Sequence, residues 1–136
     1  MPVSANSIVT PQTPLTATAV ATTANSTYTD APTNTVQLVA VQTNGARITK
    51  VTALARATVT ATELQLYVSS DGGTTKRLIA SKLMSAYTVA QTTGQTAADF
   101  GFTESIPLIL AANESLWAAI GVTNTGIVFR AEGFAY

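Results

Sequence analysis

Apolar and polar residues alternate along several short stretches of the chain, most clearly in residues 63–69. One set of alternate positions holds Leu64, Leu66 and Val68, and the other holds Glu63, Gln65, Tyr67 and Ser69. Successive side chains of a β-strand point to opposite faces, so this pattern predicts a strand that is buried on one face only. Ser70-Asp71-Gly72-Gly73 follows, and these turn-forming residues predict a tight hairpin into a returning strand.

The same reasoning predicts further strands along the body of the chain. They cover residues 35–43, 47–60, 106–110, 116–122 and 127–136. In the longest one, Ile48 is out of step with Val51, which predicts a β-bulge near Thr49–Lys50. Pro107 has no N–H to give to a ladder, so its strand is expected at a sheet edge.

The connections between these strands carry their own signals. Asn44-Gly45 is the strongest short hairpin signal and predicts a hairpin between the first two strands of the body. Residues 81–88 (SKLMSAYT) favour one or two turns of helix with Ser81 as the N-cap. Residues 90–99 are expected to form a polar loop.

About seven or eight strands with turn signals every 8–12 residues predict an all-β fold, an antiparallel β-sandwich that is jelly-roll-like.

The first 32 residues differ from the rest, which suggests an extended N-terminal arm (1–32) ahead of a sandwich body (33–136). This segment is rich in Thr, Ala and Pro and has no charge before Asp30. It could be a floppy tail or an ordered arm that docks on a neighbouring subunit through Ile8, Val9 and Leu15. Disordered tails usually carry more charge and fewer β-branched residues, which favours the arm. Removal of residues 1–32 is then expected to leave a folded body.

The chain carries few charges for its size. Only 10% of its 136 residues are charged and 46% are hydrophobic, against roughly 25% charged residues in ordinary domains. Either the protein is a monomer with a neutral, Thr-coated surface, or it hides surface against copies of itself or a larger assembly. Weakly polar strands invite pairing unless they are covered, which favours a homo-oligomer. Trp117, Phe134 and Tyr136 either cap the core or anchor such an interface.

Several kinds of chemistry lack the residues they need. Seven basic residues balance seven acidic ones without a basic run, which argues against nucleic-acid binding. The chain has no Cys and no His, so disulfides, thiolate metal sites and the commonest general base are absent. The acidic residues are scattered, and the sequence predicts neither an enzyme nor a cofactor or metal site. The start of the chain lacks a signal-peptide pattern, and Pro107, Asn113 and Glu114 interrupt its most apolar window, so no membrane contact is expected.

The hairpin turn resembles a known motif. Ser69, Asp71, Gly73 and Thr75 match the Asp box, S-x-D-x-G-x-T-W, of sialidases and related propellers, while Lys76 stands where that family has Trp. In that family the box is a hairpin turn far from the catalytic centre and recurs in each blade. This chain has one copy, so the match predicts the turn and no enzymatic activity.

Three longer segments, residues 44–79, 107–122 and 126–136, resemble small virion proteins of tailed bacteriophages, of the accessory or decoration type. The resemblance implies a β-sandwich or jelly roll that assembles as a homotrimer or on a lattice. It also implies a location in the virion and the major capsid protein or other virion proteins as partners. The expected function is a capsid decoration (cement) subunit on the capsid exterior. The alternative is a tail or fibre component that contacts a host receptor or other tail proteins.

Overall fold

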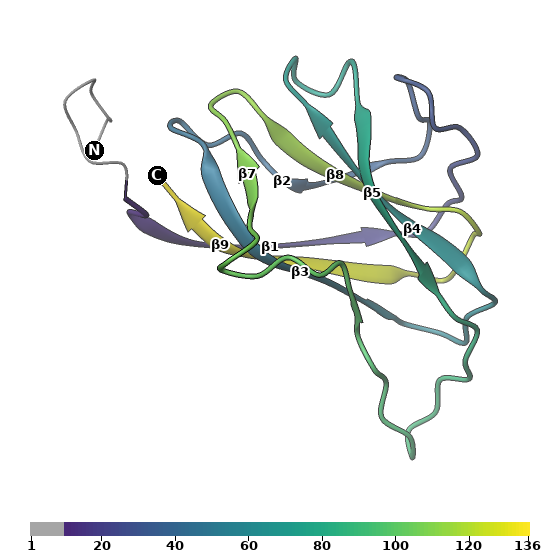
Figure 1. The fold of residues 1–136 in the computed structure, drawn as a ribbon. Helices are drawn as coiled ribbons and strands as arrows, with labels where there is room; N and C mark the ends of the chain where they lie inside the picture. Colours follow the sequence, from purple (N-terminus) through teal and green to yellow (C-terminus); the bar gives the residue numbers. More distant parts are fainter. Residues whose placement is uncertain (1–9) are drawn as a thin grey trace.

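Two antiparallel β-sheets pack face to face in the computed structural model, which describes residues 10–136 (Figure 1). Sheet A has the order β1 (Thr13–Ala21), β9 (Ile127–Ala135), β3 (Ala46–Ala55) and β6 (Ala98–Asp99), and β7 (Leu108–Leu110) also pairs with β3. Sheet B has the order β2 (Val36–Val39), β8 (Ser115–Ile120), β4 (Thr62–Ser69) and β5 (Arg77–Met84). Residues 10–136 contain no helix. The all-β sandwich predicted from the sequence is confirmed.

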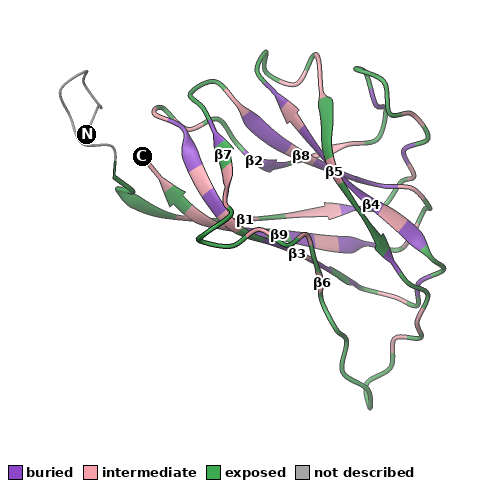
Figure 2. Cartoon of the chain, in the orientation of Figure 1, coloured by how far each residue is buried: buried purple, intermediate pink, exposed green. Residues whose placement is uncertain are grey.

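The core lies between the inner faces of the two sheets (Figure 2). Rows of paired residues run across sheet A, and in one of them Phe129 lies between Ala19 and Ala53. The large ring thus has small neighbours on both sides, and it is fully buried. On sheet B, Leu64 pairs with Ile120, and both are fully buried. Burial of one such side chain contributes about 1.5–3 kcal/mol, so these rows are the main source of stability.

The predicted bulge in the long strand is present. The pairing of β3 with β9 shifts between Ile48 and Lys50. Because of the extra residue, Ile48 and Val51 both face the core although their spacing is odd, and both are fully buried. The expected edge position of the strand after Pro107 is also found, since β7 pairs with β3 alone.

Two predictions about connections are wrong. Residues 81–88 do not form a helix, because β5 continues to Met84 and stays in register with β4. Strand pairing with β4 outweighs the local N-cap signal of Ser81. Asn44-Gly45 does not form a hairpin either. The chain turns there from β2 in sheet B to β3 in sheet A, and the N–H of Gly45 donates to the carbonyl of Gln42 at 3.1 Å.

The N-terminal division of the chain also differs from the expectation. Thr13–Ala21 lies within the segment predicted to be an arm, but it forms β1 and pairs with β9 along its whole length. The sandwich therefore includes residues that were assigned to 1–32, and the body does not begin at residue 33. Removal of 1–32 would take away a strand of sheet A.

A long irregular connection, residues 85–97, forms an excursion that extends beyond the sheets and is exposed along most of its length (Figure 2). It contains most of the polar loop predicted for residues 90–99. Its base is attached to the sandwich by a bridge between Tyr87 and Val59. Across residues 10–136, there is no helix of the length and hydropathy needed to span a membrane.

Candidate functional site

The crossing segment, residues 22–35, connects β1 in sheet A to β2 in sheet B and covers the β4 part of the outer face of sheet B. Ser81 and Leu83, on the same face of β5, are exposed. The N–H of Asn25 donates to the carbonyl of Ile120 at 2.7 Å, at the end of β8. Further along, the carbonyl of Asp30 accepts from the N–H of Lys76 at 2.9 Å, at the start of β5. The crossing segment is thus held at both sides of the sheet by backbone hydrogen bonds.

Asn25 is the polar centre beneath the crossing segment, and it is only 2% exposed. Its Nδ2 lies 2.8 Å from Oε1 of Gln65, 2.9 Å from the hydroxyl of Tyr67 and 2.8 Å from the carbonyl of Thr27. Its Oδ1 accepts from the N–H of Thr33 at 3.1 Å. One side chain therefore joins β4 to two points of the crossing segment.

The polar face of β4 is consequently buried, and the prediction of a strand buried on one face only is wrong. Gln65, Tyr67 and Ser69 are each at most 1% exposed. Burial raises the pKa of Tyr67, since the charged phenolate is poorly solvated there. At the rim, the hydroxyl of Tyr28 donates to Glu63 at 2.8 Å, and this bond raises the pKa of Tyr28.

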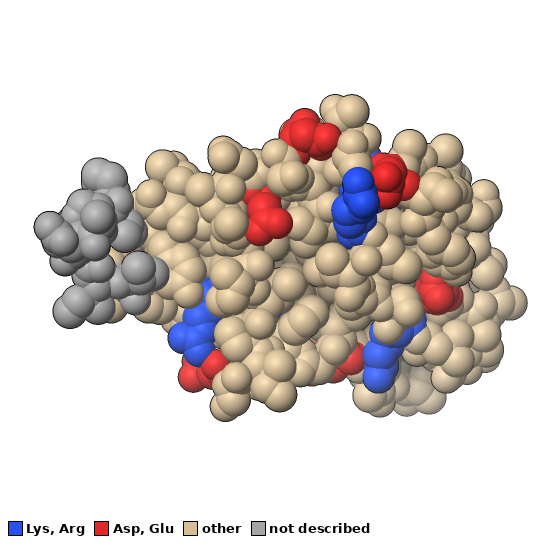
Figure 3. Space-filling model, turned by 45° about the horizontal axis from the view of Figure 1, so that its top comes forward, with Lys and Arg blue, Asp and Glu red and all other residues tan. Residues whose placement is uncertain are grey.

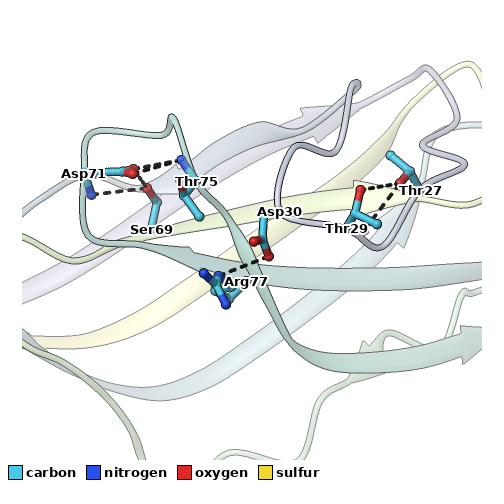
Figure 4. A network of polar contacts seen from close by, with 7 residues as sticks. All are labelled: Thr27, Thr29, Asp30, Ser69, Asp71, Thr75 and Arg77. Carbon is cyan, nitrogen blue, oxygen red and sulfur yellow. Dashed lines mark hydrogen bonds and ion pairs between the residues drawn. The ribbon is translucent and has the colours of Figure 1, made fainter.

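The turn after β4 joins it to β5 in the hairpin that the Asp-box resemblance predicts, and side chains within the turn form hydrogen bonds (Figure 4). The N–H of Gly73 donates to Oγ of Ser69 at 2.8 Å, and Ser69 Oγ donates to Asp71 at 2.9 Å. The carboxylate of Asp71 accepts from the N–H of Thr75 at 2.9 Å. This backbone bond, followed by the one from Ser69, lowers the pKa of Asp71. Beside the turn, Arg77 pairs with Asp30 at 3.1 Å.

Trp117, one of the predicted interface residues, lies half-buried against this turn on the outer face of sheet B. A Cβ on Gly73 would come within 2.7 Å of its ring, and Nζ of Lys76 lies 4.5 Å from the ring centroid. Its Nε1 donates to Oγ of Ser115 at 2.9 Å. The Asp-box pattern would place an aromatic ring at position 76. Here the ring that packs on the turn comes from β8 instead, which supports a structural role for Trp117.

The outer face of sheet A, named here the bare face, is open to solvent. It is formed by alternate residues of three strands: Pro14, Thr16, Thr18, Val20, Arg47, Lys50, Thr52, Leu54, Val128, Arg130, Glu132 and Phe134. Exposed residues occur on all three strands, for instance Thr18, Leu54 and Arg130. Its one ion pair joins Arg130 to Glu132 at 3.3 Å. Charge is also sparse elsewhere, and the view in Figure 3 shows charged side chains dispersed over a mostly uncharged surface.

The remaining predicted interface residues are partly brought together. Phe134 lies on the bare face with an exposed fraction of 36%. Leu15 packs half-buried against the core, and it lines a hollow of about 470 Å³ together with Tyr136. These three residues lie at the same end of sheet A, whereas Trp117 belongs to sheet B. Ile8 and Val9 lie outside the described residues.

A second hollow, of about 430 Å³, lies between the end of β5 and the excursion of residues 85–97. Lys82, Tyr87 and Gln95 contribute to its lining. Gln95 already uses both ends of its amide, since Nε2 donates to the carbonyl of Ala55 at 3.0 Å and Oε1 accepts from Tyr87 at 2.7 Å. The amide therefore holds the excursion to the sandwich.

Sequence reasoning missed the network around Asn25. The surrounding residues 22–35 are mostly polar and show no periodic spacing of hydrophobic residues, so no local pattern predicts a buried segment. A weak signal is available in Tyr67 and Gln65, since a large aromatic and a carboxamide on the polar face of a strand suit a hydrogen-bonded second layer.

No protein-family model matches the chain, and neither the curated proteins nor the solved structures compared with it give a match. Within residues 10–136, no three carboxylate, imidazole or thiolate groups gather in a way that could hold a metal ion.

Proposed function

We propose that this protein is a structural virion protein of a tailed bacteriophage, a decoration (cement) subunit that binds the capsid exterior. The observation that carries the proposal is the contrast between the covered face of sheet B and the bare face of sheet A. The protein hides one polar face beneath its own crossing segment and leaves the other available. A flat sheet face suits contact with another protein surface better than capture of a small molecule, which favours concave sites.

The chemistry of the bare face suits burial against a protein. Its charged residues are Arg47, Lys50, Arg130 and Glu132. Arg130 and Glu132 form an ion pair, and the guanidinium of Arg47 donates to the carbonyl of Glu104. Removal of unpaired charges from water is expensive, so a face with few of them loses little when it is covered. The centres of protein interfaces are likewise depleted of charge and enriched in aromatic residues such as Phe134.

The partners in this proposal are the major capsid protein or other virion proteins, and copies of the same chain. A homotrimer is the assembly that the resemblance implies. Attachment needs no chemical reaction. A subunit that binds the assembled shell but not its separate components stabilises the shell by mass action. Assembly takes place in the bacterial host cytoplasm, and the mature location is the virion.

Two measurements test the proposal. Virions of the phage whose genome encodes the chain are separated into heads and tails. Mass spectrometry is expected to detect the protein in the heads. Detection in tails alone would overturn the decoration role. In the second, purified protein is sedimented with capsids that lack it, and Leu54→Asp on the bare face is compared with Leu83→Asp on β5. Both leucines are exposed, at 42% and 62%.

The bare-face variant is expected to lose at least tenfold in capsid affinity, because it places a new charge in the contact. Leu83→Asp is expected to bind like the unchanged protein. Equal binding by both variants would show that the bare face is not the attachment surface, even if the chain is found in heads.

The alternative function is a tail or fibre component that contacts a host receptor or other tail proteins. The observation in its favour is the hollow of about 430 Å³ beside the excursion, where Lys82 and several hydroxyl side chains are exposed. Presence in tail fractions, with loss of host adsorption after Lys82→Ala, would support this alternative. Gln95 is not available as a receptor contact without release of the excursion.

A further inference from the structure

The edge of sheet A at β1 is unlike the other strand edges of the sandwich. β1 is the terminal strand of its sheet, and its nine residues pair with β9 without a register shift. Residues 13–21 carry no charge. An edge strand presents a row of N–H and C=O groups that can pair with another chain. A long, regular and uncharged edge is therefore a template for strand addition.

The other edges carry features that discourage such pairing. β5 has a register shift near Leu66–Tyr67 and carries Arg77 and Lys82. β2 has four residues and a shift between Gln37 and Val39. At the opposite edge of sheet A, β6 and β7 have two and three residues. Bulges, charges and short length are the usual protections of an edge. On β1 the comparable feature is Pro14, which lies near the start of the strand, so the rest of the strand can still pair.

We infer that β1 pairs antiparallel with β1 of a second copy, about a two-fold axis at Ala17, so that the two A sheets become one continuous sheet. Ala17 is the midpoint of Thr13–Ala21, so this register pairs all nine residues of both strands. It also keeps the faces matched, because inward residues lie opposite inward residues. A shift by one residue would place the inner face of one copy beside the bare face of the other.

The side chains fit this register. Thr16 lies opposite Thr18 of the second copy, and cross-strand Thr pairs stabilise antiparallel sheets. Leu15 lies opposite Ala19, so a large residue faces a small one. Because β1 has no charge, its pairing with itself brings no like charges together in any register, whereas β5 would place Arg77 and Lys82 at the contact.

The charges of the neighbouring strand are complementary across the same axis. In each copy Thr16 pairs with Glu132 of β9, and Thr18 pairs with Arg130. The row that begins at Glu132 in one copy therefore continues through Thr16 and Thr18 to Arg130 of the other. The two-fold axis repeats this row in the opposite direction, which gives two acid-to-base rows. Together with the uncharged, regular edge, this pattern favours a second copy as the occupant of the edge.

The inference is independent of capsid attachment and goes beyond it. A two-fold contact joins copies in pairs, so it cannot build a trimer, but it can connect one trimer to the next. A strand pair alone buries less than a standard interface, so we expect the isolated dimer to be weak and dependent on concentration.

Single cysteines test the contact and its register, because the chain has no Cys of its own. Ala17→Cys and Ala19→Cys are matched, since both positions are inward-facing and half-buried alanines of β1. In the proposed register the thiols introduced at position 17 of the two copies face each other at disulfide distance. Position 19 lies opposite position 15 of the second copy, so the two introduced thiols at position 19 are four residues apart along the strands. This separation of about 13 Å exceeds the disulfide limit of about 7 Å.

After mild oxidation of concentrated protein, Ala17→Cys is expected to give a covalent dimer on non-reducing gels, with at least tenfold more product than Ala19→Cys. Equal yields from the two variants, or no dimer from either, would overturn the inference. Fluorescence and circular dichroism of the reduced variants verify that both are folded.

The second test uses the reversible dimer. Analytical ultracentrifugation of the unchanged protein is expected to show dimer growth with concentration. Thr18→Lys is expected to weaken dimerisation at least tenfold, because a charged residue on an edge opposes pairing. Leu54→Lys places the same charge on the bare face away from the edge and is expected to leave dimerisation unchanged. A strict monomer, or equal loss in both variants, would contradict the proposal.

Discussion

The outer faces of sheets A and B have similar residues and opposite environments. On both sheets, outer-face residues alternate along the strands with apolar inner-face residues. Both outer faces are rich in uncharged polar side chains. On sheet B the crossing segment buries Gln65 and Tyr67, whereas on sheet A Thr18 and Leu54 remain exposed. The difference lies in the matching of hydrogen-bond groups, because a polar face can be buried only where each group finds a partner. Asn25 supplies those partners on sheet B.

The largest expected effect comes from removal of that side chain. Asn25→Ala removes the hydrogen bonds that Asn25 makes with the N–H of Thr33, the carboxamide of Gln65 and the hydroxyl of Tyr67. Each buried group that loses its hydrogen bond costs about 1–3 kcal/mol. We expect the free energy of unfolding, measured with urea, to fall by about 4 kcal/mol. Thr18→Ala on the bare face is the control and is expected to change it by less than about 0.5 kcal/mol.

The second prediction concerns the turn that covers Trp117. Gly72 and Gly73 both have positive φ, of 79° and 99°, so alanine is strained at either position. Only at Gly73 would the new Cβ meet the Trp117 ring. We expect unfolding free energy to fall by about 1 kcal/mol in Gly72→Ala and by about 2–3 kcal/mol in Gly73→Ala. Equal effects in urea denaturation would show that the ring contact contributes nothing.

The third prediction uses alkaline pH to probe the covered face. The raised pKa of Tyr67 means that folding favours the neutral phenol. Its contribution is fully present below the ordinary tyrosine pKa of about 10 and is lost as pH rises through the higher folded value. We expect Tyr67→Phe to be less stable than the unchanged protein near neutrality and to lose less stability above about pH 10. Tyr28→Phe, at the exposed rim, is the comparison variant, because it removes the hydrogen bond to Glu63 that raises the pKa of Tyr28.

The fourth prediction concerns acid. The lowered pKa of Asp71 means that folding favours the carboxylate. Its contribution is present above the ordinary aspartate pKa of about 4 and is lost as pH falls through the lower folded value. Asp71→Asn is expected to flatten the acid limb of stability measured between about pH 2 and pH 5. An unchanged acid limb would show that the turn does not depend on this charge.

The smallest expected effect lies on the bare face. Leu54 is 42% exposed, so Leu54→Ser removes little buried area and is expected to shift unfolding free energy by less than about 0.5 kcal/mol. A loss of more than about 1 kcal/mol in urea denaturation of dilute protein would show that this face is covered even in the isolated chain.

Local periodicity was sufficient for much of the fold. The alternation around Leu64 located β4, and the offset between Ile48 and Val51 located the bulge, because both patterns depend only on neighbours in sequence. The helix predicted at Ser81 is absent because pairing of β5 with β4 outweighs the local preference. The hairpin predicted at Asn44-Gly45 is absent because the chain changes sheet there. The packing of the crossing segment on sheet B could not be predicted. Asn25 and Gln65 are 40 residues apart, and no local pattern indicates that they are in contact.

The candidate interface was only partly accessible for the same reason. Phe134 and Tyr136 were predicted as interface residues because they alternate with the apolar face of the last strand, and strand pairing places Phe134 beside β1. Trp117 carries the same compositional signal but packs against the hairpin turn of its own chain. Residue type alone cannot distinguish these environments, because large aromatic rings occur both in contacts within a chain and at interfaces.

The position of Trp117 gives the protein a built-in optical reporter. It is the only tryptophan in the chain. Its indole lies beneath Lys76 and beside Gly73, so its emission reports on the packing of one turn. Circular dichroism follows the two sheets as a whole. Denaturation curves from the two signals that coincide would show that turn and sandwich unfold together, whereas an earlier fluorescence change would reveal the turn as a separately opening unit.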